Sequence, residues 1–294
     1  MPIGGLRVTQ FVKTVLIGMP FVCALGVFVD WQHDNAILRH QGIEITRNLN
    51  RDSARIRAIN DWVSQNRGFG KNDHYFMVAA LGPTPVQVLE YGGDCSDKSR
   101  LVGAMLTELN IDAGLVMLSP CPKCGFIHTV VEARSESGRM VVDPIWHVDY
   151  PTEDGRFLGV RDLAGTSLGR DRVAELQKER GLADKIAAMP ATEATFDYAV
   201  GMNWDKDTAT RTVAATLRLL GYTPDQMFRP RFLEDPKLAL SLFLICIGMI
   251  AVCAKFLMHF SGRFVQTIAG RRIRDPGKTA EPVGLQGEPD AARR

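Results

Sequence analysis

Two long apolar runs dominate the hydrophobic pattern of this 294-residue chain. They cover residues 14–29 and 238–254 without a charged or amide side chain, and the membrane spans expected from them are residues 14–29 and 237–258. With the apolar residues beside it, each run is long enough to cross the hydrocarbon core of a bilayer as one helix. A cleaved signal peptide is the alternative for the first run, but the small residues around position 24 form a poor cleavage site. The pattern therefore predicts two transmembrane helices.

Basic side chains flank both runs on the sides toward the chain ends. Arg7 and Lys13 precede the first run, and a basic cluster that begins at Lys255 follows the second. Because cytoplasmic flanks of membrane helices are enriched in Lys and Arg, we expect residues 1–13 and 259–294 in the cytoplasm. The second of these segments is predicted to be a basic, partly disordered tail that contacts anionic membrane lipid.

The region between the runs predicts one domain with an extension. Residues 30–48 carry little signal and are expected to be a linker, and residues 49–165 combine amphipathic helical patterns with strands of period two, which predicts an α+β domain. Residues 166–236 are expected to form a helical extension. Its two helical patterns cover Arg172–Met189 and Asp207–Leu220. Acidic side chains outnumber basic ones between the runs, so nothing there favours a nucleic-acid partner.

A cysteine stands at the predicted start of a helix. Cys95 follows a Gly-Gly turn, and Asp94 is a good N-cap residue with Asp97 three positions later, as in a capping box. Unsatisfied backbone N–H groups and the positive end of the helix dipole favour a thiolate at such a position. The apolar stripe that predicts the helix comprises Leu101, Val102, Met105, Leu106 and Leu109.

A predicted β-hairpin downstream brings a histidine and a carboxylate together. The strand patterns cover 126–133 and 140–143, with a turn at Ser135–Gly138 between them. If the hairpin folds about this turn, His128 faces a residue at or within two positions of Asp143 on the same sheet face. A carboxylate there can hold one nitrogen of the imidazole while the other nitrogen accepts the thiol proton.

A Gly-x-Cys at a helix start, a His on a strand and an Asp-Pro that closes the next strand resemble the core of the transglutaminase-like superfamily. The similarity covers residues 49–162 and includes the preceding helix at Ser53–Gln65. It also includes the segment Asn110–Val116, although Asn110 and Asp112 stand where the family usually has Gly and Pro. The resemblance implies a papain-like α+β fold, with a helix that bears the cysteine packed on an antiparallel sheet that bears the other two residues.

The resemblance also implies a function. It assigns Cys95, His128 and Asp143 as a catalytic triad for acyl transfer or amide hydrolysis through a thioester, on a peptide or protein substrate, with no metal or organic cofactor. The expected location is the inner membrane of a bacterium, with the domain in the periplasm. The alternative is a non-catalytic scaffold or binding partner in a cell-envelope or exopolysaccharide assembly complex, with other envelope membrane proteins as partners.

Five further residues are candidates for supporting roles. Asn72 and Tyr91, in or beside a predicted long loop over Gly68–Gln87, are expected to line the substrate site or donate to the oxyanion, and Trp146 is expected to wall the substrate groove. Cys121 and Cys124 flank a two-residue turn and favour a small disulfide. Half of a zinc site, a redox pair and two plain thiols are the alternatives for these two cysteines.

Overall fold

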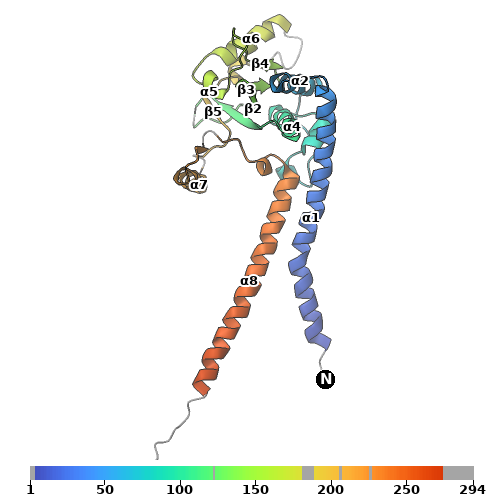
Figure 1. The fold of residues 1–294 in the computed structure, drawn as a ribbon, viewed down its shortest axis with the longest axis vertical. Helices are drawn as coiled ribbons and strands as arrows, with labels where there is room; N and C mark the ends of the chain where they lie inside the picture. The colour runs from blue at the N-terminus through green and yellow to red at the C-terminus, as the bar shows by residue number, and fades with distance from the viewer. Residues whose placement is uncertain (1–3, 122, 181–188, 205–206, 225–226, 274–294) are drawn as a thin grey trace, which may run out of the picture. The chain divides into compact units, whose positions relative to one another are not determined.

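The computed structural model describes residues 4–121, 123–180, 189–204, 207–224 and 227–273 (Figure 1). The chain divides into two compact units, one made of residues 20–245 and the other of residues 1–19 with 246–294. All the strands that the structure describes belong to the first unit.

Two long helices, α1 (Gly4–Thr46) and α8 (Pro236–Ile273), hold the two apolar runs. Their stretches Val15–Thr46 and Pro236–Met258 are long and apolar enough to cross a membrane. Helix α1 does not end with its apolar run but continues through the segment that was expected only as a linker. Helix α8 likewise continues into the expected tail, whose remaining residues, 274–294, lie outside the described residues.

Packing against the domain explains why α1 stays helical beyond its apolar run. Leu38 is buried in the core of the domain, and a Cβ added at Gly42 would lie 3.4 Å from the side chain of Leu109. Helix α8 adds an ion pair of 2.6 Å between Lys237 and Asp34. Such tertiary contacts, rather than intrinsic propensity, supply most of the stability of a helix in a protein.

The domain is built on a five-stranded antiparallel sheet with the order β4-β3-β2-β1-β5. Its strands are β1 (Ala113–Ser119), β2 (His128–Ser135), β3 (Gly138–Asp143), β4 (Val148–Asp149) and β5 (Tyr198–Val200). As predicted, β2 and β3 form a hairpin that turns after Ser135, which pairs with Gly138. The α+β fold class is thereby confirmed.

Helices cover both faces of the sheet (Figure 1). On one face, α2 (Asp52–Gln65) and α4 (Cys95–Glu108) bury their apolar stripes against the β2–β3 hairpin. On the other face, α5 (Val160–Leu163) and α6 (Leu168–Arg180) enclose a second core. The second core also holds Trp146, Tyr150 and Phe196. Both faces of the sheet are therefore covered, which suits strands that carry apolar residues on either side.

The segment that was predicted as a long loop contains two short helices. A 3₁₀ turn, η1, covers Ala79–Leu81, and helix α3 covers Pro85–Tyr91. Thr84 caps α3 and forms a capping box with Gln87, with a proline in the first helical position. The prediction of a loop up to Gln87 was therefore wrong at its end, although the capping signal is present in the sequence.

The extension after Asp162 is not purely helical. It supplies α6, the 3₁₀ turns η2 (Ala191–Glu193) and η4 (Arg231–Leu233), and α7 (Thr208–Leu219). It also supplies the edge strand β5, in which Tyr198 pairs with Ser119 of β1. Helix α6 begins at Leu168, four residues before its predicted start, and part of the predicted helix, residues 181–188, lies outside the described residues.

Candidate active site

The structure places Cys95 at the first position of helix α4. The Asp94 carboxylate accepts hydrogen bonds from the backbone N–H groups of Ser96 (2.9 Å) and Asp97 (3.1 Å). Asp97 completes the capping box by accepting from the N–H of Asp94 at 3.4 Å. The helix therefore begins at a fixed residue, and the half-buried Cys95 side chain lies against the second core.

Two glycines make the turn before Cys95 possible. Gly92 has a φ of +81°, and a Cβ there would lie 2.7 Å from the carbonyl oxygen of Gly68. A Cβ at Gly93 would lie 2.3 Å from the Cβ of Asp97. Because side chains fit at neither position, the Gly-Gly pair is required to bring the chain into α4 at this angle.

The hairpin positions the other two residues of the expected triad. His128 begins β2 and Asp143 ends β3, and the pairing of Val131 with Val142 sets them diagonally across one face of the sheet. Their side chains are completely buried, and His128 Nε2 lies 2.6 Å from Asp143 Oδ2. This distance is typical of a charge-assisted hydrogen bond.

The second imidazole nitrogen remains available to the thiol. His128 Nδ1 is buried and has no hydrogen-bond partner among the described residues within normal bonding distance. The Cys95 side chain interacts with this imidazole, and Asp143 occupies Nε2. The structure therefore brings Cys95, His128 and Asp143 together with the imidazole between the other two side chains, an arrangement in which a histidine can accept a thiol proton.

Electrostatics at the site favour a charged imidazole. Burial disfavours the charge on His128, but the charge and hydrogen bond of Asp143, with a further contribution from Cys95, outweigh burial and raise the pKa of His128 to about 10. At neutral pH the imidazole is therefore protonated and lies between a carboxylate and the sulfur atom. This arrangement places a cationic imidazole beside the Cys95 sulfur.

The chain after β3 fixes the carboxylate of Asp143. Its second oxygen, Oδ1, accepts from the backbone N–H groups of Ile145 (2.8 Å) and Trp146 (3.3 Å). The Trp146 ring meets the His128 ring edge-on, with centroids 4.4 Å apart. Since Trp146 is only 2 % exposed, it supports the imidazole from within the core rather than lining an open groove.

Asn72 and Tyr91 lie in the segment that precedes the nucleophile. Asn72 is buried, and its amide donates to the carbonyl of Gly92 at 2.7 Å and accepts from the N–H of His74 at 2.8 Å. Its polar atoms are thus engaged in shaping the turn before Cys95. Tyr91 is 52 % exposed and stacks on His74 with ring centroids 3.6 Å apart.

Lys98 is a buried charge that the sequence did not single out. It lies one turn after Cys95, and its ammonium donates to the backbone carbonyls of four residues at the end of α2, namely 63, 64, 66 and 67, at 2.9–3.3 Å. Burial lowers the pKa of Lys98 to about 8. A cation at the negative end of a helix dipole is stabilising, so Lys98 ties the nucleophile helix α4 to α2.

Glu193 is a second residue that sequence reasoning missed. It lies in η2 and is half-buried. Burial raises the pKa of Glu193, and the charge of His128 opposes that rise, which places this carboxylate near the imidazole. Glu193 follows His128 by 65 positions, outside the segment that resembles a known family, and no local pattern marks it.

Cys121 and Cys124 form a disulfide, with an S–S distance of 2.11 Å. Cys23, Cys246 and Cys253, all in the two long helices, are free, as is Cys95. Within the described part of the chain, no group of three or more His, Cys, Asp or Glu side chains could hold a metal ion. These findings leave Cys95 as the free thiol of the globular domain.

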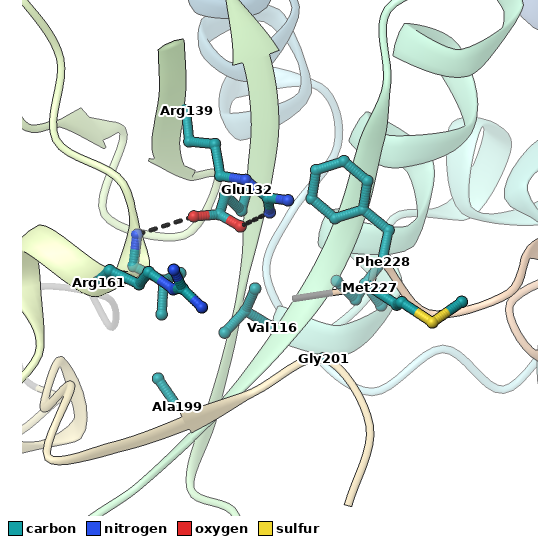
Figure 2. Close-up of a pocket in the computed structure, with 10 residues that line it drawn as sticks. Val116, Glu132, Arg139, Arg161, Ala199, Gly201, Met227 and Phe228 are labelled. Carbon is teal, nitrogen blue, oxygen red and sulfur yellow. Dashed lines mark hydrogen bonds and ion pairs between the residues drawn. The ribbon is translucent and has the colours of Figure 1, made fainter. Parts of the chain in front are cut away.

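A cavity of about 180 Å³ lies beside the sheet, and its lining does not include Cys95, His128 or Asp143. Figure 2 shows Glu132, Arg139 and Phe228 at this cavity. Glu132 of β2 closes one side through an ion pair of 2.5 Å with Arg139 and a hydrogen bond from the N–H of Val160. Arg139 stacks on Phe228, with its guanidinium carbon 4.5 Å from the ring centroid. The charged groups of this cavity are therefore largely paired with each other.

No protein-family model, curated protein or solved structure matches this chain.

Proposed function

We propose that the protein is a membrane-anchored, transglutaminase-like cysteine enzyme that transfers acyl groups or hydrolyses amides through a thioester. The single observation that carries this proposal is the buried His128–Asp143 pair of 2.6 Å, set against a cysteine at a helix N-terminus. A helix that bears the cysteine and packs on an antiparallel sheet that bears the other two residues also supports a papain-like core.

The chemistry proceeds in two steps. The Cys95 sulfur attacks the carbonyl carbon of a carboxamide or peptide, and His128 passes the thiol proton to the departing amine nitrogen as the C–N bond breaks. The resulting thioester is then attacked by water or by a second amine, whose proton returns through His128 while the C–S bond breaks and Cys95 is regenerated. Water as the acceptor gives hydrolysis or deamidation, and an amine gives cross-linking.

Stabilisation of the tetrahedral oxyanion requires donors at the helix start. The capping carboxylate engages the N–H groups of Ser96 and Asp97, so the N–H of Cys95 itself is the donor that we assign. The amide of Asn72 is engaged with Gly92 and His74, which argues against Asn72 as the second donor. Asp143 contributes by holding the imidazole tautomer and stabilising the imidazolium.

The proposed location follows from the two long helices and their basic flanks. We place α1 and α8 across the inner membrane of a bacterium, with both termini in the cytoplasm and the domain in the periplasm. The disulfide between Cys121 and Cys124 supports an oxidising compartment for the domain. The partners are a peptide or protein substrate and membrane lipid.

The alternative is a non-catalytic scaffold in an envelope assembly complex. The observation that favours it is that Cys95, His128 and Asp143 line none of four cavities found in the described part of the chain. A triad without an open substrate cleft is expected in a protein that keeps the fold for binding.

Labelling of Cys95 with iodoacetamide at neutral pH tests the proposal. We expect fast alkylation in the wild type and much slower alkylation in His128→Ala. The matched control is His147→Ala, since His147 is also paired with a carboxylate, that of Asp61, at 2.8 Å. Slow alkylation of the wild type that does not change in His128→Ala would favour the scaffold.

A further inference from the structure

An exposed apolar loop lies outside the chemistry described above. It comprises six consecutive apolar residues, Phe76–Leu81, within a stretch from His74 to Leu89 that holds no acidic or basic residue other than histidine. Met77 is 72 % exposed and Val78 is 55 % exposed. Side chains of this kind on a surface loop indicate a binding surface.

The backbone holds this apolar loop in a defined shape. The N–H of Val78 donates to the carbonyl of Phe76 at 2.7 Å, which makes a three-residue turn with Met77 at its tip. Met77 has a φ of +63°, a conformation that residues other than glycine rarely adopt. The N–H of Phe76 closes the base by donating to Gly82 at 3.0 Å. A strained residue that displays an apolar side chain to solvent points to a role for that side chain.

A contact with α8 locates the loop. The Lys237 ammonium lies 5.8 Å from the centroid of the Phe76 ring. Lys237 is the second residue of the stretch in α8 that is apolar enough to span a membrane, and its ammonium also pairs with Asp30 (2.7 Å) and Asp34 (2.6 Å) of α1. The apolar loop therefore begins at the level where the apolar part of α1 ends and that of α8 starts.

We propose that the apolar loop Phe76–Leu81 rests in the headgroup region of the bilayer that α1 and α8 cross. The inference rests on the membrane part of the proposed function. Its occupant is lipid, because the loop adjoins the point where the chain itself enters the membrane and carries no charge that would oppose insertion. Apolar side chains at the interface gain free energy by entering the boundary between headgroups and acyl chains.

This contact has a consequence for the substrate. The loop is continuous with the segment that shapes the nucleophile turn, through the Asn72 amide on Gly92 (2.7 Å) and the stack of His74 on Tyr91. A loop seated in the bilayer holds Cys95 near the membrane surface. The substrates that this geometry favours are peptides or proteins attached to the same membrane.

Depth-dependent quenching tests the lipid contact directly. The full chain carrying Met77→Trp is placed in nanodiscs of phosphatidylethanolamine and phosphatidylglycerol, with or without lipids brominated near the headgroup, and the emission of the wild type is subtracted. We expect the added tryptophan to lose much of its emission to the brominated lipid, because a side chain at the interface lies at the depth of the headgroups. The control is Leu168→Trp on α6, an apolar position that is 47 % exposed, which should lose little.

Equal quenching at the two positions, or none at position 77, would overturn the proposal. A blue-shifted emission at position 77 without quenching would assign the loop to a second copy of the protein and would also overturn it. Neither result depends on the reactivity of Cys95, so this arm does not test the thioester chemistry.

A second arm compares two alkylating probes on Cys95. One is soluble iodoacetamide and the other is an iodoacetyl group tethered to a lipid headgroup in the same nanodisc, with Cys23, Cys246 and Cys253 replaced by Ser. We expect Met77→Asp with Val78→Asp to lower the ratio of tethered to soluble labelling about tenfold, because buried charge opposes insertion. Leu168→Asp should leave the ratio unchanged.

An unchanged ratio in the double variant would overturn the proposal. The soluble probe also reports whether the double variant is folded, since its rate on Cys95 should match the wild type. Failure of the proposed function has a different signature, namely a soluble-probe rate that is insensitive to His128→Ala.

Discussion

Replacement of Asp143 by Asn separates the catalytic role of this residue from its structural role. In the wild type, Oδ2 faces His128 Nε2 at 2.6 Å, while Oδ1 accepts from the N–H groups of Ile145 and Trp146. An Asn side chain must keep its oxygen toward these two N–H groups, because a flipped amide would oppose donor to donor at a buried site. Its NH₂ group therefore faces Nε2, which must then act as acceptor.

The consequence is that the imidazole of His128 adopts the wrong tautomer. With Nε2 as acceptor, the neutral imidazole carries its proton on Nδ1, the nitrogen that has to accept the thiol proton. The variant also loses the carboxylate charge that raises the pKa of His128 to about 10, and a fall to the ordinary value of 6.5 removes on the order of 5 kcal/mol of imidazolium stabilisation. The same exchange in a serine-protease triad lowers turnover about 10⁴-fold, and we expect a loss of that order in Asp143→Asn.

The assay measures turnover on a responsive substrate, the alkylation rate of Cys95 and the melting temperature. Stability at neutral pH should fall by about 4 kcal/mol, which is the lost stabilisation of the imidazolium, while the two backbone hydrogen bonds to Oδ1 survive and keep the turn after β3 in place. Asp149→Asn is the matched control, since Asp149 is also a paired carboxylate beside β3, 2.5 Å from Arg57. An Asp143→Asn protein that is unfolded, or one with turnover close to that of the wild type, would refute this reasoning.

Three further predictions concern pH, packing and topology. The difference in stability between Cys95→Ser and Cys95→Ser with His128→Gln should fall as pH rises above 6.5, by up to about 1.4 kcal/mol per pH unit in a calorimetric series, because folded His128 retains a proton that the unfolded chain has lost. The fall should end below pH 10, because Cys95 contributes to the raised pKa of His128 and is absent from both variants. Lys98→Met should lower stability by about 2–4 kcal/mol, since four carbonyls at the end of α2 lose their donor, and exposed Lys71→Met should not; thermal denaturation measures both. Reporter fusions after Arg274 should be active only in the cytoplasm and fusions near Arg170 only outside, and the reverse pattern would disprove the orientation.

Local signals made the core of the candidate site predictable. The Asp94–Asp97 capping box marks the start of α4 within one residue, and the strand patterns around a four-residue turn give the register that sets His128 diagonal to Asp143. Both signals depend on residues close together in the chain, where hydrogen-bonding geometry allows few solutions. Asn110 is similar, since its φ of +61° is a conformation that glycine adopts freely and asparagine tolerates.

Features that depend on distant residues were not predictable in the same way. The four acceptors of Lys98 are backbone carbonyls in the last turn of α2 and in the two residues that follow Gln65, so no side-chain pattern predicts them. Strand β5 has only three residues, and its pairing with β1 carries no turn signal because the two strands are far apart in sequence. Trp146 was assigned to a groove because aromatic residues serve cores and binding sites alike, and only burial distinguishes the two.

The extension is part of the candidate site and not an appendage to it. Phe196 and Ala194 lie in the same core as Trp146, which supports His128, and Glu193 is close enough to influence the imidazole. Further along, Glu234 lies 3.9 Å from Arg100 of α4. At the other end of α4, Arg231 pairs with Glu108 at 2.7 Å.

These contacts hold the nucleophile helix at two points along its length to the segment that leads directly into α8. Arg100 also pairs with Asp97, the residue that completes the cap beside Cys95. Glu234, Arg100 and Asp97 thus form a chain of ion pairs from the segment before α8 to the start of α4. The resemblance to a known family ends near residue 162. The residues between that point and the second long helix nevertheless hold α4, which bears the thiol. The domain that performs the proposed chemistry therefore has to include the extension as well as the segment that resembles the family.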